Sequence, residues 1–241
     1  MKKSIKILLT IILILVLTSA AVVVWHYKNI SAVLNGLTKT SEEIASEINK
    51  KRDDLKVKVE KYTNSSINDL TAQDERKLLK GEISLDEIAE KYDLPIEYMN
   101  DEDCIQKDTP TKGENSSVKK SDDSIKKIEK EIGDSVSCMY ALKAKYVNKL
   151  GELEREVIDQ YSKLPKSKQN KEGKKELVMA NVDYVAKLEK TCDSEVDKVI
   201  FALEKNLKEL GGDLEIIQIL KDAYNDEKEL KKSYYMSLYN E

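Results

Sequence analysis

Over residues 125–241, apolar residues recur every three or four positions with few interruptions. Such spacing is typical of amphipathic helices, because about 3.6 residues complete one helical turn. Pro165 divides the stretch once, since a proline disfavours helical geometry in the residue before it, and Gly211 and Gly212 divide it again. Asp213 can cap the helix that follows. Three consecutive helices with short connections predict an elongated antiparallel three-helix bundle at the C-terminus.

The composition supports an all-α fold. Charged residues make up 36% of the 241 residues, whereas glycine occurs eight times and proline three times. Long solvated helices fit this balance better than sheets joined by tight turns. The net charge of −4 offers no general attraction to nucleic acid, whose phosphates bind clustered basic residues.

A run of 19 uncharged residues (7–25) stands near the N-terminus, after Lys2, Lys3 and Lys6. At about 1.5 Å per residue, a helix of this length spans a hydrocarbon layer of about 30 Å. Trp25 closes the run at a position suited to an interfacial aromatic residue. We therefore expect residues 7–25 to form a transmembrane helix that serves as a signal anchor and binds the protein to the membrane.

Positive charge is concentrated before this run. Three lysines and the α-amino group precede it, whereas only Lys28 and Lys39 fall in the next fifteen residues. Because positive flanks stay on the cytoplasmic side, residues 1–6 are expected in the cytoplasm and the remainder outside it, as a single-pass protein of the cell membrane. The alternative is a signal peptide cleaved after Ala20, but the apolar run extends beyond a signal-peptide core.

Three segments precede the predicted bundle. Residues 26–62 carry apolar positions in alternating steps of four and three, which indicates a coiled-coil-like helical stalk. Residues 63–100 hold enough apolar positions for two or three short helices, so we expect a small helical module there. Its acidic second half, with Lys91 as the only basic residue, would repel phosphates, and we expect no binding to nucleic acid. Residues 101–124 are almost entirely polar and are predicted to be a disordered linker.

Cys138 and Cys192 fall on consecutive predicted helices, and a compartment outside the cytoplasm permits disulfides. In an antiparallel pair, a bridge between them centres the turn on Pro165, where the first helix is expected to end. We therefore predict a Cys138–Cys192 disulfide. A turn at Gln169-Asn170 would instead place the two cysteines about ten residues out of register, or about 15 Å apart along the axis, which is too far. Without the bridge, both are small buried apolar side chains.

Motifs for catalysis and ligand binding are scarce. His26 is the only histidine and follows the membrane run, so histidine-dependent nucleophiles and metal sites lack their usual groups. The sequence contains no glycine-rich phosphate loop, no dinucleotide fingerprint and no Cys-x-x-Cys pair. Carboxylate pairs for sugar cleavage cannot be recognised among 45 acidic residues. We expect a protein without enzymatic activity, cofactor, metal or small-molecule ligand.

Two segments offer surfaces for a partner. Six lysines cluster around the predicted turn, offset only by Glu172, and can meet an anionic polymer or lipid headgroups; alternatively, they solvate a loop and a helix end. These lysines are Lys163, Lys166, Lys168, Lys171, Lys174 and Lys175. Near the C-terminus, Tyr235 and Tyr239 add aromatic surface beyond what one core-facing stripe requires, although they can also line the rim of the bundle.

Five short segments carry a resemblance to known proteins. They are Cys138-Met139-Tyr140-Ala141-Leu142, Leu164-Pro165, Cys192-Asp193, Gly211-Gly212-Asp213 and Lys232-Ser233-Tyr234-Tyr235. This pattern resembles a group of membrane-anchored helical proteins from Gram-positive bacteria. The resemblance implies no established activity, so it assigns no functional residue.

Together these patterns favour a non-catalytic envelope protein that acts as a structural or protein-interaction module. Its expected contacts are the membrane and either another protein or a second copy of itself. One alternative is a sensor or regulatory subunit whose anchor pairs with another membrane protein. A less favoured alternative is an enzyme that acts on the cell wall.

Overall fold

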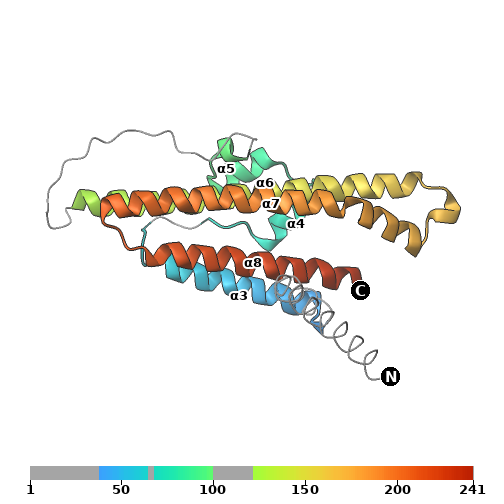
Figure 1. Cartoon of the computed structure of the whole chain (residues 1–241), viewed down its shortest axis with the longest axis horizontal. Coiled ribbons are helices and arrows are strands. Elements are labelled where there is room, and N and C mark those ends of the chain that lie inside the picture. Colours follow the sequence, from blue (N-terminus) through green and yellow to red (C-terminus); the bar gives the residue numbers. More distant parts are fainter. Residues whose placement is uncertain (1–37, 65–67, 100–121, 241) are drawn as a thin grey trace, which may run out of the picture. The chain divides into compact units, whose positions relative to one another are not determined.

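The computed structural model describes residues 38–64, 68–99 and 122–240, and each regular element within these ranges is a helix (Figure 1). The all-α prediction is confirmed. The predicted cytoplasmic segment 1–6 and transmembrane run 7–25 lie outside the described residues. Among the helices that are described, none has both the length and the apolar content of a membrane crossing.

The chain divides into two compact units, residues 1–58 with 218–241 and residues 59–217. In the first unit, the described helices are α3 (Ser41–Val59) and the greater part of α8 (Glu215–Asn240). They lie side by side and antiparallel (Figure 1). The first unit therefore joins two segments from distant parts of the sequence.

An apolar cluster and two ion pairs hold α3 and α8 together. Ile44, Ile48 and Leu230 are buried in one cluster, and Tyr234 packs against it. The ion pairs join Lys51 to Asp226 at 2.7 Å and Arg52 to Glu227 at 2.6 Å. Arg52 is the better shielded of the two cations, so its pair resists screening by salt more than the exposed pair of Lys51 does.

This pairing changes two predictions. The predicted stalk (26–62) is helical over Ser41–Val59, but its apolar stripe is buried against α8 instead of forming a lone stalk. The predicted three-helix bundle (125–241) is divided between the units, because α8 belongs with α3 from residue 218 onward. An amphipathic stripe specifies that a helix is covered on one face but not which segment covers it.

The second unit is built on a hairpin of two long antiparallel helices, α6 (Asp122–Lys163) and α7 (Lys171–Leu210). With a rise of about 1.5 Å per residue, each helix is about 60 Å long. The predicted linker (101–124) mostly lies outside the described residues, although its last three residues already belong to α6.

The ends of these helices follow the sequence closely. α6 ends shortly before Pro165, and a short 3-10 helix, η2 (Lys166–Lys168), leads to Asn170. The side chain of Asn170 accepts a hydrogen bond from the Gly173 amide and caps α7. At the other end, Gly211 adopts a left-handed conformation with φ of 67°, which glycine reaches at little cost.

The register of the hairpin corrects the predicted disulfide. Lys145 of α6 pairs with Glu195 of α7, which centres the turn near residue 170 instead of Pro165. The two cysteines therefore lie about ten residues out of register, or about 15 Å along the axis, beyond the reach of a bridge. The structure holds both Cys138, which is buried, and Cys192, which is partly exposed, as thiols. Buried polar groups, and not the cysteines, set the register.

The segment predicted as a small helical module (63–100) contains α4 (Ala72–Lys80), α5 (Leu85–Tyr92) and the 3-10 helix η1 (Ile96–Tyr98). All three pack against α6. The buried apolar side chains among the described residues of this segment are Leu70, Leu78, Ile88, Ala89, Tyr92, Leu94 and Met99. The module is thus a third layer over one part of the hairpin.

Side-chain caps define the two short α-helices of the module. The hydroxyl of Thr71 accepts from the Asp74 amide at the start of α4. Ser84 and Glu87 form a reciprocal capping box at the start of α5, and these bonds from Ser84 lower the pKa of the Glu87 carboxyl. Short helices are marginal alone, so the caps and the contact with α6 together account for their stability.

Candidate functional site

The half of the hairpin next to the turn, residues 152–190, has an unusual surface, and we call it the distal arm. Among its described side chains, no apolar one is buried. Ile158 is 60% exposed, Tyr184 48% and Val185 39%. The half-buried apolar residues are Leu153, Val157, Tyr161, Leu164, Leu177 and Leu188. Among the described side chains, which do not include those of Val178, Met179 and Val182, the apolar stripe of the distal arm is at most half-buried.

In the rest of the hairpin, residues 122–151 and 191–210, the module packs on α6, and we call this part the covered half. The module lies close to α6 at Gly151, where a Cβ atom would lie 2.1 Å from the backbone oxygen of Leu79. One turn later, the Arg155 guanidinium donates to the same oxygen at 2.8 Å. Ile158, which follows after a further turn, is already exposed. The distal arm begins where the third layer ends.

The two helices of the distal arm also separate from each other. In Figure 1, the first part of α7 diverges from α6 toward the turn. Ile158 of α6 and Tyr184 of α7 lie within about one helical turn of the same level, given the register set by Lys145 and Glu195. Apolar side chains on both helices are thus open at one level of the hairpin, and exposed apolar patches of this kind mark interaction sites.

Charge is distributed unevenly along the distal arm. Near its base, Glu152, Glu154 and Glu156 of α6 are exposed, and none forms an ion pair with another described residue. Glu152 and Glu156 lie on one side of the apolar stripe of α6 and Glu154 on the other, and we call these three residues together the acidic strip. Arg155 lies between them, and Lys187 and Lys190 of α7 are exposed at about the same level of the hairpin. Over both helices, residues 152–159 and 181–190 carry six acidic and three basic side chains, so the base of the distal arm has a net negative charge.

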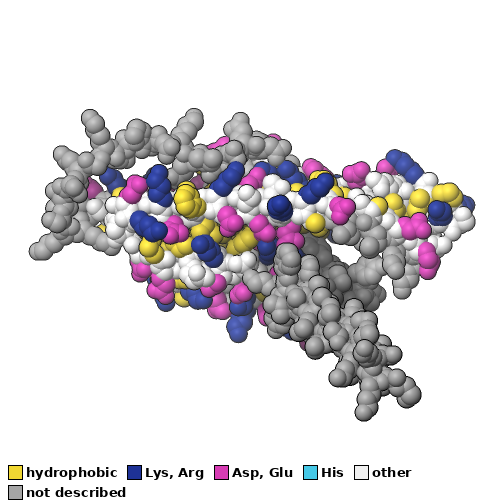
Figure 2. All heavy atoms as spheres, in the orientation of Figure 1, with side chains coloured by type: hydrophobic (Ala, Val, Ile, Leu, Met, Phe, Trp, Pro, Cys, Tyr) yellow, Lys and Arg dark blue, Asp and Glu magenta, His cyan; other side chains and the backbone are white. Residues whose placement is uncertain are grey.

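The six lysines predicted as a contact surface lie together at the turn, and we call them the basic tip. Lys163 ends α6, Lys166 and Lys168 bound η2, and Lys171, Lys174 and Lys175 lie in the first turns of α7. Lys163 pairs with Asp159, and Lys168 approaches Glu176 at 3.9 Å, whereas Lys166 has no ion-pair partner among the described residues. Figure 2 shows lysine and apolar side chains next to each other at this end of the hairpin.

The position of the basic tip is electrostatically unfavourable in the isolated chain. Lys171, Lys174 and Lys175 stand at the N-terminal end of α7, where the helix dipole already places partial positive charge. A nearby anionic surface would relieve this repulsion. The side chains of these three lysines lie outside the described ones, as do those of Tyr235 and Tyr239 in α8, so the tyrosine surface stays a prediction.

The sequence did not indicate the most deeply buried charge in the second unit. Lys145 is only 2% exposed, and its ammonium group lies 3.1 Å from Glu195. The hydroxyl of Tyr146 donates to the same carboxylate at 3.0 Å. A signal was present, because Lys145 follows Leu142 by three positions and so continues the apolar stripe. This group anchors the hairpin and has the character of a structural pair.

A second polar cluster joins the module to α6. The pKa of Asp74 is lowered to about 2 by hydrogen bonds from Lys91, then Tyr92, and to a lesser extent Thr71. Lys143 of α6 reaches Asp69 at 2.7 Å and Glu75 at 2.9 Å. The bonds of Asp74 lie within the module, whereas those of Lys143 join the module to α6, so we assign both a structural role.

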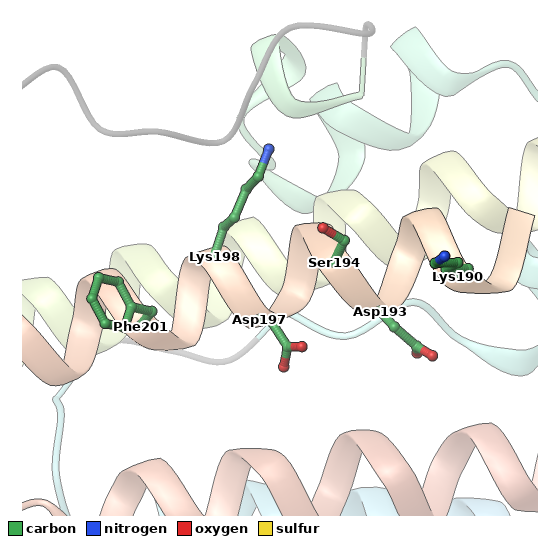
Figure 3. A pocket seen from close by; sticks show the side chains of 6 residues that line it. All are labelled: Lys190, Asp193, Ser194, Asp197, Lys198 and Phe201. Atoms are coloured by element: carbon green, nitrogen blue, oxygen red, sulfur yellow. The ribbon is translucent and has the colours of Figure 1, made fainter.

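A shallow hollow of about 480 Å³ lies along α7 and is lined by Lys190, Asp193, Ser194, Asp197, Lys198 and Phe201. Figure 3 shows that Asp193 and Asp197 point to one side of the helix, whereas Ser194 and Lys198 point to the other. Phe201, which is 71% exposed, lies at one end. Because these polar groups diverge, the hollow does not assemble a catalytic or ligand-binding arrangement.

Within the described residues, no group of three or more histidine, cysteine or acidic side chains is placed to hold a metal ion. Comparisons of the chain with protein-family models, with curated proteins and with solved structures gave no match. The distal arm, with its open apolar stripe, acidic strip and basic tip, is the strongest candidate for a functional surface.

Proposed function

We propose that this chain is a non-catalytic, membrane-anchored protein of the cell envelope whose distal arm binds protein. The observation that supports this proposal is the lack of any buried apolar side chain among those described in residues 152–190, although the apolar spacing continues there. A two-helix layer buries only the stripe between its helices and leaves the remaining apolar surface for a further layer. Helical partners commonly supply such a layer by packing an amphipathic face into the groove.

The anchor and the side of the membrane are supported by the sequence. The uncharged run 7–25 and the lysines before it favour a single span with the C-terminal part outside the cytoplasm. In this arrangement the chain holds the distal arm in the extracytoplasmic space. The protein would then act as a tethered binding module of the envelope.

Site-specific photocrosslinking in the full-length chain tests the proposed surface. A photoreactive amino acid is placed at Ile158 or Tyr184, and matched controls carry it at Lys205 or Glu209, which are exposed on the covered half of α7. We expect discrete protein adducts from the first two positions and none from the controls. Equal labelling at all four positions, or none at any, would contradict a binding role for the distal arm.

Exchange of the membrane span separates this proposal from the regulatory-subunit alternative. Residues 7–25 are replaced by an unrelated single-pass span in the chain that carries the photoreactive group at Ile158. Binding through the distal arm predicts that the same adducts persist. Their loss would favour a partner recognised within the membrane.

A further inference from the structure

If two copies of the chain associate through their distal arms, each copy supplies one two-helix layer. Two antiparallel helices from each copy form a four-helix bundle, an arrangement in which each hairpin supplies the layer that the other lacks. Identical chains related by a twofold axis use the same surface on both sides. The exposed residues Ile158, Tyr184 and Val185 would then be buried between the copies.

The charges of the distal arm favour one orientation of such a pair. If the two arms ran in the same direction, the basic tips would meet each other and so would the acidic strips. If they run in opposite directions, each basic tip lies beside the acidic strip of the other copy. From Glu154 to Lys163 the arm extends nine residues along α6, or about 14 Å, so two arms need to overlap only over this length to bring tip and strip together. Charge complementarity of this kind fixes the orientation of an interface.

The charged side chains of the acidic strip and the basic tip can contact a second copy without breaking a strong ion pair. Glu152, Glu154 and Glu156 form no ion pair with a described residue, and neither does Lys166; Glu152 accepts an exposed hydrogen bond from Asn148, and Glu156 accepts one from Gln160. Lys163 and Lys168 are exposed, and their pairs with Asp159 and Glu176 are of the weak surface kind.

We infer that the occupant of the distal arm is the distal arm of a second copy, packed antiparallel so that each basic tip contacts the acidic strip of its partner. This inference rests on the proposed function, because it names the protein that the distal arm binds. The chain is then a homodimer that joins two anchored copies through their hairpins.

A charge-swap experiment with the full-length chain tests the inference. One variant carries Glu152→Lys, Glu154→Lys and Glu156→Lys, and the other carries Lys163→Glu, Lys166→Glu and Lys168→Glu. Because like charges then face each other, each variant alone should dimerise at least about tenfold more weakly than the unmodified chain in sedimentation measurements. An equimolar mixture of the two variants should form a heterodimer. In it, one contact joins the unchanged basic tip to the unchanged acidic strip, and the other joins the reversed tip to the reversed strip, so both are attractive.

A matched control has the same change in charge away from the distal arm. It carries Asp53→Lys, Glu90→Lys and Glu209→Lys, all at exposed positions. This control should dimerise within about twofold of the unmodified chain, because charges beyond a Debye length of about 10 Å are screened. Weakening equal to that of the acidic-strip variant would overturn the inference.

The remaining outcomes also decide between the proposals. A monomeric chain at all concentrations, with photocrosslinks from Ile158 to a different protein, overturns the dimer but leaves the proposed function intact. A monomeric chain without any crosslink overturns both. A dimer that the charge swaps do not weaken, or that the mixture does not restore, overturns the antiparallel arrangement.

Discussion

The two halves of the α6–α7 hairpin have the same apolar spacing but different surroundings. In the covered half, Leu142, Val199 and Leu203 are buried, and Lys145 is paired with Glu195 beneath the surface. In the distal arm, Ile158 and Val185 are exposed. The spacing of apolar residues therefore indicates where helices form, but it does not determine how deeply each side chain is buried.

The largest expected effect concerns the buried charge of the covered half. Lys145→Ala leaves Glu195 without its cation and should lower the free energy of unfolding by about 3 kcal/mol. Lys163→Ala removes an exposed pair in the distal arm and should cost less than about 0.5 kcal/mol. Urea unfolding followed by circular dichroism measures both values. If both variants lowered the free energy of unfolding equally, the covered half and the distal arm would not differ in how their charges contribute to stability.

A double variant shows whether the first loss comes from the stranded charge. Lys145→Met with Glu195→Leu replaces both partners by apolar side chains of similar size. Exchanges of this kind are often neutral, so the double variant should be more stable than Lys145→Ala by about 2 kcal/mol or more. A double variant as unstable as the single one would assign the loss to packing instead.

The next effect concerns the boundary between the halves. Gly151→Val places a side chain where the Leu79 backbone already lies, so the module must shift away from α6. Overpacking of this size costs about 2 kcal/mol. Relative to the unmodified chain, amide hydrogen exchange in the variant should become faster in α4 and α5 than it does in α7. Glu154→Val, one turn along the same helix but exposed, serves as the control and should leave these rates unchanged.

A smaller, pH-dependent effect concerns the contact of Asp74 within the module. Its pKa in the folded protein is about 2, below its ordinary value of 3.8. Folding therefore favours the ionised carboxylate, and this stabilisation is present above about pH 4 and is lost as the pH falls toward 2. Asp74→Asn should cost about 1 kcal/mol at pH 7, because the pair with the exposed Lys91 is partly screened.

The difference between the unmodified chain and Asp74→Asn is the quantity to follow. It should shrink steadily in thermal unfolding measured from pH 4 to pH 2. A difference that stays constant over this range would show that Asp74 does not titrate as the geometry predicts.

The smallest expected effect is in the distal arm itself. Val185→Ala, measured below the concentration at which the chain dimerises, should change the free energy of unfolding by no more than about 0.5 kcal/mol. The same substitution at Val199, which is buried on the same helix, should cost about 2 kcal/mol. Comparable losses at both positions would mean that the distal arm has a core of its own.

The sequence predicted the helices and their ends more successfully than their partners. Pro165 and Gly211 affect the backbone conformation only of residues close to them in sequence. The end of α6 and the end of α7 were therefore predictable. The pairing of α8 with α3 was not, because any amphipathic helix of suitable length can cover another. The six lysines of the basic tip were recognisable from the sequence, and their role as a contact surface stays a prediction.

The hairpin register shows why the remainder was missed. Cys138 and Cys192 suggested a turn at Pro165, but a thiol pair carries no geometric information until its helices are aligned. The decisive residues, Lys145 and Glu195, resemble surface charges when read alone. Exposure of Ile158 was equally hidden, because an apolar residue that faces a partner has the same spacing as one that faces a core.

The pairing of α3 with α8 has a consequence for synthesis. Lys51 and Asp226 are 175 residues apart, whereas the second unit is one continuous segment, residues 59–217. At about 5–20 residues per second, a ribosome needs about 10–35 s to make the intervening chain. The hairpin and its module can fold during that interval, while α3 waits for a helix that has not yet been made. Chaperones that shield apolar helices should therefore act on α3 first.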